Sequence, residues 1–237
     1  MFGREKIEYK TPEQVSCMRR AGLVVAAALR AVEDAAAAGL TTADLDAVAA
    51  AVIADAGATA SFLGYEGFPA TVCVSVNDAV IHGIPGGRVL ADGDLVSVDC
   101  GAIVDGWHAD AAVSFVVGGE AAADPRDLAL IRATDDAMWA GVAALASGER
   151  LSAVANAVDD SITDAAERDG ARYGIVEDYV GHGIGTAMRQ PPDVLNYRTR
   201  ERGAKIRPGM CLAVEPMVTR GDQLTHVCED DWTVVSS

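Results

Sequence analysis

Two carboxylates stand inside the apolar runs of the stretch DLVSVDCGAIVDGWHADAAVSFVVG, where a buried strand would carry hydrophobic side chains. Asp99 lies in the first run and Asp110 in the second, and the dipeptide Asp105-Gly106 between them is typical of a tight β-hairpin turn. If two residues form the turn, Asp99 pairs with Ala112 and Asp110 pairs with Gly101. Side chains alternate along a strand, so both acids then share one face of the hairpin.

Diagonal neighbours on one face of a hairpin lie roughly 7 Å apart at the backbone. Two buried carboxylates at that separation repel each other and are costly to desolvate unless a cation lies between them. A pair of divalent metal ions, roughly 3.5–4 Å apart in hydrolytic sites, fits such a space. The alternative is a strand end at which both acids reach water, and a three-residue loop would place them on opposite faces.

Three further residues extend this set of candidate chemical groups. His182 lies between glycines in VGHGIG, and Glu215 is an acid in the apolar run LAVEPMV. Together with Asp99 and Asp110 they form an oxygen-rich set with one imidazole, which suits Mn, Fe, Co or Zn in a hydrolytic dimetal site better than a structural zinc held by thiolates. His82, in SVNDAVIHGIPGG, adds an imidazole that can donate a hydrogen bond to a scissile amide. A lone histidine is, however, more often a satisfied core residue than a ligand.

Composition limits the classes of protein that the chain can belong to. Its 237 residues, half of them hydrophobic, can bury the core of one large domain or of two fused halves. A formal charge of −16 argues against direct binding of nucleic acid and of anionic membranes. The five cysteines have no CxxC spacing, and the start of the chain has no apolar signal region. We therefore expect a soluble cytoplasmic protein.

Helix caps and apolar periodicity indicate two similar halves, each with two helices followed by strands. This repeated pattern predicts a central sheet that carries the candidate carboxylates, with the helices packed outside it. Beside the turn of the hairpin, we expect His108 to be exposed to solvent. The expected helices run from Thr11 to Gly39, from Thr41 to Gly57, from Asp124 through Leu145 and from Ser152 to Gly170, and the expected strands cover 71–76, the hairpin 94–118, 176–180 and 210–218.

The motifs SVNDAVIHGIP, SVDCGAIVDGWHAD, VGHGIG and LAVEPMV, in this order, resemble those of type I methionine aminopeptidases. The resemblance covers nearly the whole chain. It implies the α+β pita-bread fold, with two pseudo-symmetric halves, a central curved and mostly antiparallel sheet, and helices outside. It also implies a single catalytic domain over residues 1–237 and a metal-dependent hydrolase that removes the initiator methionine from nascent polypeptides.

The resemblance also implies roles for individual residues. Asp99, Asp110, His182 and Glu215 become the ligands of two divalent ions (Co, Mn, Fe or Zn), with Glu215 also catalytic, and His82 becomes a catalytic residue that contacts the substrate amide. The residues at positions similar to those around the family's methionine pocket are Phe62, Tyr65, Phe68, Cys73, Met188 and Trp232. A thioether side chain is well served by aromatic and sulfur neighbours, although each of these six residues is also typical of a plain core. The implied partners are nascent amino termini, with action at the ribosome left open, for a monomer that binds no membrane.

The sequence departs from the family pattern at two places. Seven residues after the first histidine the family has a second one, whereas this chain has Arg189, which we place among the substrate-binding residues. Arginine cannot act as an acid or base near neutral pH. The family's fifth ligand is a glutamate on a final strand beyond Trp232, and we expect the last strand or strands to be missing here.

These departures keep two alternatives open. The chain can be a catalytically impaired or inactive binding module that keeps the fold, an interpretation that Arg189 and the missing terminal acid favour and the four retained ligands oppose. It can also be a proline-directed peptidase of the same fold. Those relatives usually carry an extra amino-terminal domain, and this chain begins almost directly with the catalytic fold.

Overall fold

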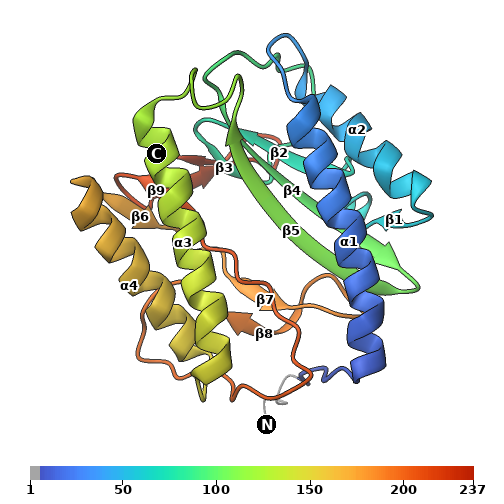
Figure 1. Cartoon of the computed structure of the whole chain (residues 1–237), viewed down its shortest axis with the longest axis vertical. Helices are drawn as coiled ribbons and strands as arrows, with labels where there is room; N and C mark the ends of the chain where they lie inside the picture. Colours follow the sequence, from blue (N-terminus) through green and yellow to red (C-terminus); the bar gives the residue numbers. More distant parts are fainter. Residues whose placement is uncertain (1–5) are drawn as a thin grey trace. The chain divides into compact units, whose positions relative to one another are not determined.

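A computed structural model describes residues 6–237, which form two compact units (Figure 1). Unit 1 comprises the described residues through Val15 together with Arg132–Leu224, and unit 2 comprises Ser16–Ile131 and Thr225–Ser237. Two helices have residues in both units: α1, Pro12–Ala35, and α3, Pro125–Ser147. No helix among the described residues is long and apolar enough to cross a membrane.

Unit 2 is built on an antiparallel sheet with β4 between β2 and β5, and with β1 paired to the distal part of β4. A smaller antiparallel sheet joins β10, β11 and β3. The elements of this unit, besides most of α1 and the start of α3, are α2 (Thr42–Asp55), β1 (Thr59–Ala60), a short 3-10 helix (Tyr65–Gly67), β2 (Val72–Val76), β3 (Ala79–Ile81), β4 (Leu95–Val104), β5 (Trp107–Val116), β10 (Thr225–Val227) and β11 (Val234–Ser236).

The β4–β5 hairpin has the two-residue turn that the sequence predicts. Asp105 and Gly106 have φ angles of 51° and 79°, both in the left-handed region that this class of turn requires. The resulting register pairs Asp99 with Ala112 and Gly101 with Asp110. The prediction that both acids lie on one face of the hairpin is therefore confirmed.

Capping boxes fix where the two amino-terminal helices begin. At the start of α1, the backbone N–H of Gln14 donates to Thr11 Oγ1, and the backbone N–H of Thr11 donates to Gln14 Oε1. Thr41 and Asp44 make the same reciprocal pair at the start of α2. Both helices end earlier than predicted, α1 at Ala35 and α2 at Asp55.

The core of unit 2 lies between α1, α2 and one face of the sheet (Figure 1). Val96, Val98 and Cys100 of β4 are completely buried on that face. They meet Val25 and Val32 of α1, and Leu45 and Ile53 of α2, in one hydrophobic cluster. Since Asp99 alternates with these residues, it lies on the opposite, less enclosed face.

Unit 1 packs α3 against α4 (Ser152–Asp169), with four short strands completing it. The strands pair as β6 (Tyr173–Ile175) with β9 (Val218–Arg220), and as β7 (Gly181–Gly183) with β8 (Gln190–Val194), both antiparallel. Gly141 allows α3 to pack closely against Val158 of α4 and against Val214, because a Cβ at position 141 would lie 2.9 Å from side-chain atoms of both valines.

Two strand predictions in unit 1 are wrong in extent. The strand expected over 176–180 forms earlier in the chain, as β6 over Tyr173–Ile175. Of the run expected over 210–218, only Val218 lies in a strand, β9, which continues to Arg220. The segment before β9 is held instead by single contacts to β7, in which Ala213 N donates to the His182 carbonyl and Ile184 N donates to the Cys211 carbonyl. Pro216 has no N–H to offer a ladder, which explains why regular pairing does not continue through this segment.

Candidate metal and substrate site

The carboxylate face of the β4–β5 hairpin is crowded with small residues. Asp99 and Asp110 are both half-buried there. Gly101, the partner of Asp110 in the ladder, has no room for a side chain, because a Cβ would lie 2.7 Å from the Cβ of Ser61 and 2.9 Å from the ring of Phe62. The register and these close contacts place the two acids on one face beside a glycine that has no room for a side chain.

Cys73 lies on β2 directly opposite Asp99. Burial raises the pKa of its thiol far above the usual range, and the negative charges of Asp99 and Asp110 raise it further. The same causes raise the pKa of Cys100 to about 12. The Cys73 thiol is therefore neutral near neutral pH, which makes this an oxygen-donor face rather than a thiolate one, and Cys100 lies on the opposite face of the sheet, in the core.

His82 is held in a strained backbone conformation just after β3. Its φ angle is 58°, in the left-handed region that non-glycine residues rarely adopt. The next residue, Gly83, is fixed against β2: its N–H donates to Ser75 Oγ, its carbonyl accepts from Val74 N, and a Cβ would lie 2.3 Å from the Val74 carbonyl oxygen. These contacts fix the direction in which the His82 side chain leaves the backbone.

Trp232 contacts two other rings of unit 2, those of Phe68 and His82. The ring of Trp232 meets Phe68 edge-on at 5.1 Å between centroids and meets His82 edge-on at 6.3 Å. Phe62 and Phe68 are buried, whereas Tyr65 and Trp232 keep part of their surface exposed. Five of the six residues predicted for the methionine pocket lie in unit 2, and the sixth, Met188, lies in unit 1 together with Arg189.

The imidazole of His182 lies beside the carboxylate of Glu215 in unit 1, with 3.3 Å between Nε2 and Oε1. On the other side of the ring, Nδ1 lies 3.0 Å from the carbonyl oxygen of Gly183. A carbonyl can only accept, so Nδ1 carries a proton and Nε2 directs either a lone pair or a second proton at the carboxylate. In the neutral ring, two electron-rich atoms face each other, and a cation between them satisfies both.

The glycines around His182 make room for the protein backbone. A Cβ at Gly181 would lie 2.3 Å from the carbonyl oxygen of Ala213, and one at Gly183 would lie 2.3 Å from that of Pro191. These two glycines therefore allow β7 to pack closely between neighbouring segments of the chain. This packing, with the bond from Ala213 N to the His182 carbonyl, keeps His182 in register with the segment that carries Glu215.

Asn196 is a residue of this site that sequence analysis missed. It is completely buried, and its Nδ2 donates to the backbone carbonyl of Glu215 at 3.0 Å. Glu215 lies outside any strand, so its carbonyl has no partner in a β-ladder, and Asn196 supplies a hydrogen bond to this carbonyl instead. The only signal in the sequence is an asparagine next to an apolar run, which is too common to identify such a role.

His108 is half-buried rather than exposed, which corrects the sequence expectation. Its Nδ1 lies 3.0 Å from Ser61 Oγ, and burial lowers the pKa of the imidazole. Proximity to the turn does not expose this imidazole, because Ser61 of the loop after β1 covers it at this end of the hairpin.

Arg189, for which the resemblance implies a histidine, is exposed. Arg189 Nη2 lies 3.7 Å from Asp193 Oδ1, and both side chains are largely in water. An ion pair of this kind contributes little to stability. The guanidinium is thus available to a carbonyl or carboxylate oxygen of a bound peptide, although it cannot transfer a proton.

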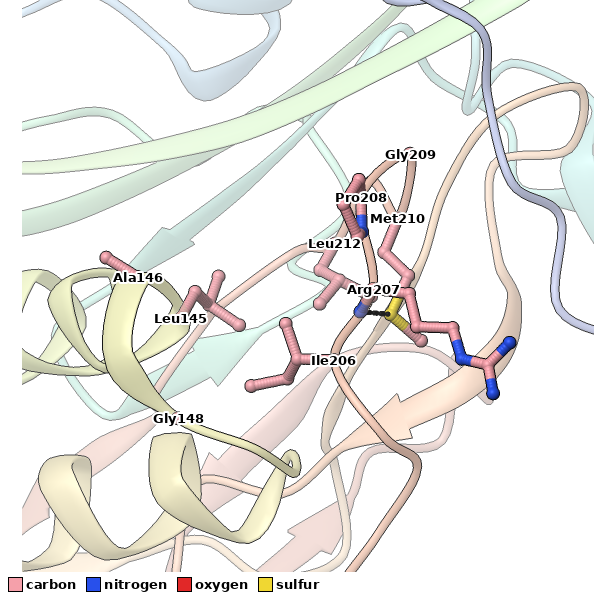
Figure 2. A pocket seen from close by; sticks show the side chains of 9 residues that line it. All are labelled: Leu145, Ala146, Gly148, Ile206, Arg207, Pro208, Gly209, Met210 and Leu212. Carbon is pink, nitrogen blue, oxygen red and sulfur yellow. Dashed lines mark hydrogen bonds between the residues drawn. The ribbon is translucent and has the colours of Figure 1, made fainter.

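A pocket of about 430 Å³ in unit 1 differs from these residues in its chemistry (Figure 2). Leu145, Ile206, Pro208, Met210 and Leu212 supply most of its lining, and the side chain of Arg207 extends away from Leu145 and Ile206. Among the described residues that line it there is no histidine, cysteine or carboxylate, so these residues offer no ligand set for a metal.

The structure thus gives two donor pairs, one in each unit. Asp99 and Asp110 share a face of the hairpin in unit 2, and His182 and Glu215 are adjacent in unit 1. Among residues 6–237, no three histidine, cysteine or carboxylate side chains are grouped as a complete metal site. Carboxylate oxygens with one imidazole nitrogen are suitable ligands for Mn, Fe, Co or Zn, so the donor set fits a divalent metal.

Comparison with known proteins identifies the family. The model of metallopeptidase family M24 matches residues 16–236. The chain is 47% identical to methionine aminopeptidase 1 of Mycobacterium tuberculosis (strain CDC 1551 / Oshkosh) over 236 residues, which are 99% of this chain and 88% of that protein.

Solved structures agree with this assignment. The methionine aminopeptidase of Thermotoga maritima is 36% identical, with a TM-score of 0.90 over 98% of this chain and 90% of that one. Prolidase from Pyrococcus furiosus, at 18% identity, has a TM-score of 0.71 over 90% of this chain and 60% of that one, which shows the shared fold alone. The predicted α+β pita-bread fold with antiparallel sheets is confirmed. The chain therefore belongs to the type I methionine aminopeptidases of metallopeptidase family M24, hydrolases that depend on divalent metal and remove the initiator methionine.

Proposed function

We propose that the two units act as one catalytic domain in which Asp99, Asp110, His182 and Glu215 hold two divalent ions, drawn from Co, Mn, Fe and Zn. The observation that carries the proposal is the hairpin register, which sets Asp99 and Asp110 on one face beside small residues. The short distance from His182 Nε2 to Glu215 Oε1 supports the second pair. Bound metal of this kind polarises a peptide carbonyl and makes a water molecule more acidic.

The remaining groups bind and orient the peptide. Glu215, whose backbone is held by Asn196, accepts the proton of the attacking water. His82, held by the Gly83 contacts and its ring contact to Trp232, donates to the scissile amide. Arg189 provides a fixed positive charge for an oxygen of the bound peptide, and the methionine side chain packs among Phe62, Tyr65, Phe68, Cys73, Met188 and Trp232.

The biological substrate is proposed to be the amino terminus of a nascent polypeptide, processed in the cytoplasm by a monomer. All five cysteines are free thiols, as a reducing compartment favours. The net charge of −16 disfavours direct binding to nucleic acid and to anionic membranes, and it leaves open whether the enzyme works at the ribosome.

Release of methionine from the peptide Met-Ala-Ser tests the proposed function. We expect the purified chain to release free methionine when Mn(II) or Co(II) is added, and to stop when a chelator removes the metal. Readdition of the metal should restore the reaction. A chain that binds the metal and folds normally but releases no methionine under any of these conditions would support the inactive binding module instead.

A further inference from the structure

Lys10 is a buried cation that lies beside the carboxylate of Glu8. Its side chain is only 1% exposed, and Nζ lies 3.3 Å from Glu8 Oε2. The same ammonium donates to the Glu8 backbone carbonyl at 3.2 Å, while Lys10 N donates to the carbonyl of Gly209 at 2.7 Å. A buried charge without a partner is strongly destabilising. The ion pair with Glu8 therefore stabilises the position of Lys10 and of the chain segment before α1.

The Glu8 carboxylate joins this segment to a loop far along the chain. Thr186 donates to it twice, from its backbone N–H at 3.2 Å and from Oγ1 at 2.9 Å, and Gln190 Nε2 donates at 2.7 Å. Burial would raise the pKa of Glu8, but the hydrogen bonds from Gln190 and Thr186, together with Lys10, lower it to about 2. Glu8 is therefore anionic near neutral pH, and its hydrogen bonds are charge-assisted ones.

Gly185 shows how closely the two segments pack. A Cβ at this position would lie 2.1 Å from Glu8 Oε2 and 2.4 Å from Lys10 Cε. The glycine is thus required by the Glu8–Lys10 pair. A further bond, from Gly185 N to the Ala187 carbonyl at 3.0 Å, closes the loop on itself around Thr186, the first of its contacts with Glu8.

The loop over residues 185–189 contains Met188 and Arg189 and begins three residues after His182. Glu8 contacts the chain on both sides of these two residues, through Thr186 in the loop and through Gln190, the first residue of β8. We propose that Glu8 is a positioning residue, which fixes this loop so that Met188 and Arg189 are placed for substrate binding. The inference rests on the proposed function, because it assigns Glu8 an effect on the binding of a methionyl peptide.

The test is the substitution Glu8→Gln. It keeps the size of the side chain and removes the negative charge of the carboxylate, which accepts three hydrogen bonds from Thr186 and Gln190. Since charge-assisted hydrogen bonds are lost and the loop is no longer fixed, KM for Met-Ala-Ser should rise by about tenfold. kcat and the number of bound metal ions should stay within about twofold of the wild-type values, because no proposed ligand is touched. The matched control is Glu33→Gln, the same substitution at an exposed residue of α1, which should leave KM unchanged.

Thr186→Val provides a second variant that keeps the Glu8–Lys10 pair and removes one donor. It should also raise KM for Met-Ala-Ser. If Glu8→Gln does not fold, this variant still tests whether the contacts between Glu8 and the loop affect substrate binding. Hydrogen exchange in the peptide that covers 183–190 should be faster in both variants than in the wild type. This readout does not need activity, so it tests the role of Glu8 even if the wild type releases no methionine.

A KM within twofold of the wild-type value in folded Glu8→Gln, or unchanged exchange over 183–190, would overturn the proposal. A loss that falls on kcat or on metal stoichiometry, with KM unchanged, would overturn it as well, because Glu8 would then act on the metal site rather than on substrate binding.

Discussion

Asp110→Asn is expected to weaken binding of the more weakly held metal ion by more than about 100-fold. Loss of groups that merely support metal ligands typically costs 10–100-fold in affinity, so loss of a ligand itself should cost more. The substitution removes a negative charge with little change in volume, which leaves the pairing of Asp110 with Gly101 intact. Calorimetric titration with Mn(II) or Co(II) should show one bound ion or none, and methionine release should fall in parallel.

Asp105→Asn is the matched control in the same hairpin. Asp105 is 64% exposed and forms an ion pair with Arg20 Nη2 at 2.7 Å, a surface contact of small energetic value. Asparagine also tolerates the positive φ of this turn position. The control should keep the metal stoichiometry and activity of the wild type. Two ions bound to folded Asp110→Asn with unchanged affinity would show that Asp110 is not a ligand.

Methionine should be preferred over lysine at the amino terminus by more than about 100-fold in kcat/KM, which corresponds to about 2.7 kcal/mol. Phe62, Phe68 and Cys73 are buried, and burial keeps the Cys73 thiol neutral. These side chains give an unbranched thioether dispersion contacts, whereas they offer an ammonium group no charged partner.

Competition between Met-Ala-Ser and Lys-Ala-Ser in one reaction measures this ratio directly, because both peptides then meet the same enzyme and the same metal. Glutamate at the amino terminus should be rejected as strongly as lysine. Comparable release of lysine and methionine would show that the aromatic and sulfur residues belong to the core and do not form the substrate pocket.

The parts of the fold that local chemistry decides were predictable from the sequence. The Asp105-Gly106 turn fixed the register of the hairpin, and with it the shared face of Asp99 and Asp110. Thr11 with Gln14 and Thr41 with Asp44 close the capping boxes that begin α1 and α2. Each of these signals involves residues close in sequence, which is why patterns alone reveal them.

The contacts that position the site were not predictable, because they join residues far apart in the chain. Glu8 meets Thr186 across 178 positions, and Asn196 supports Glu215 through a backbone carbonyl that any residue would present. The prediction of a strand around Glu215 was wrong for a similar reason. The apolar pattern of LAVEPMV is that of a strand, but the segment is held by single bonds to β7 and by Asn196.

The central claim is that Asp99, Asp110, His182 and Glu215 act on the same metal ions. A double-mutant cycle with Asp110→Asn and His182→Ala, measured as the free energy of Co(II) binding by titration, tests it most directly. If the two residues bind the same metal ions, the double variant should bind Co(II) only a little more weakly than the weaker-binding single variant. The first substitution then already removes most of the affinity that both ligands provide together. Losses of binding free energy that simply add would contradict the account, since Asp110 and His182 would then serve independent sites.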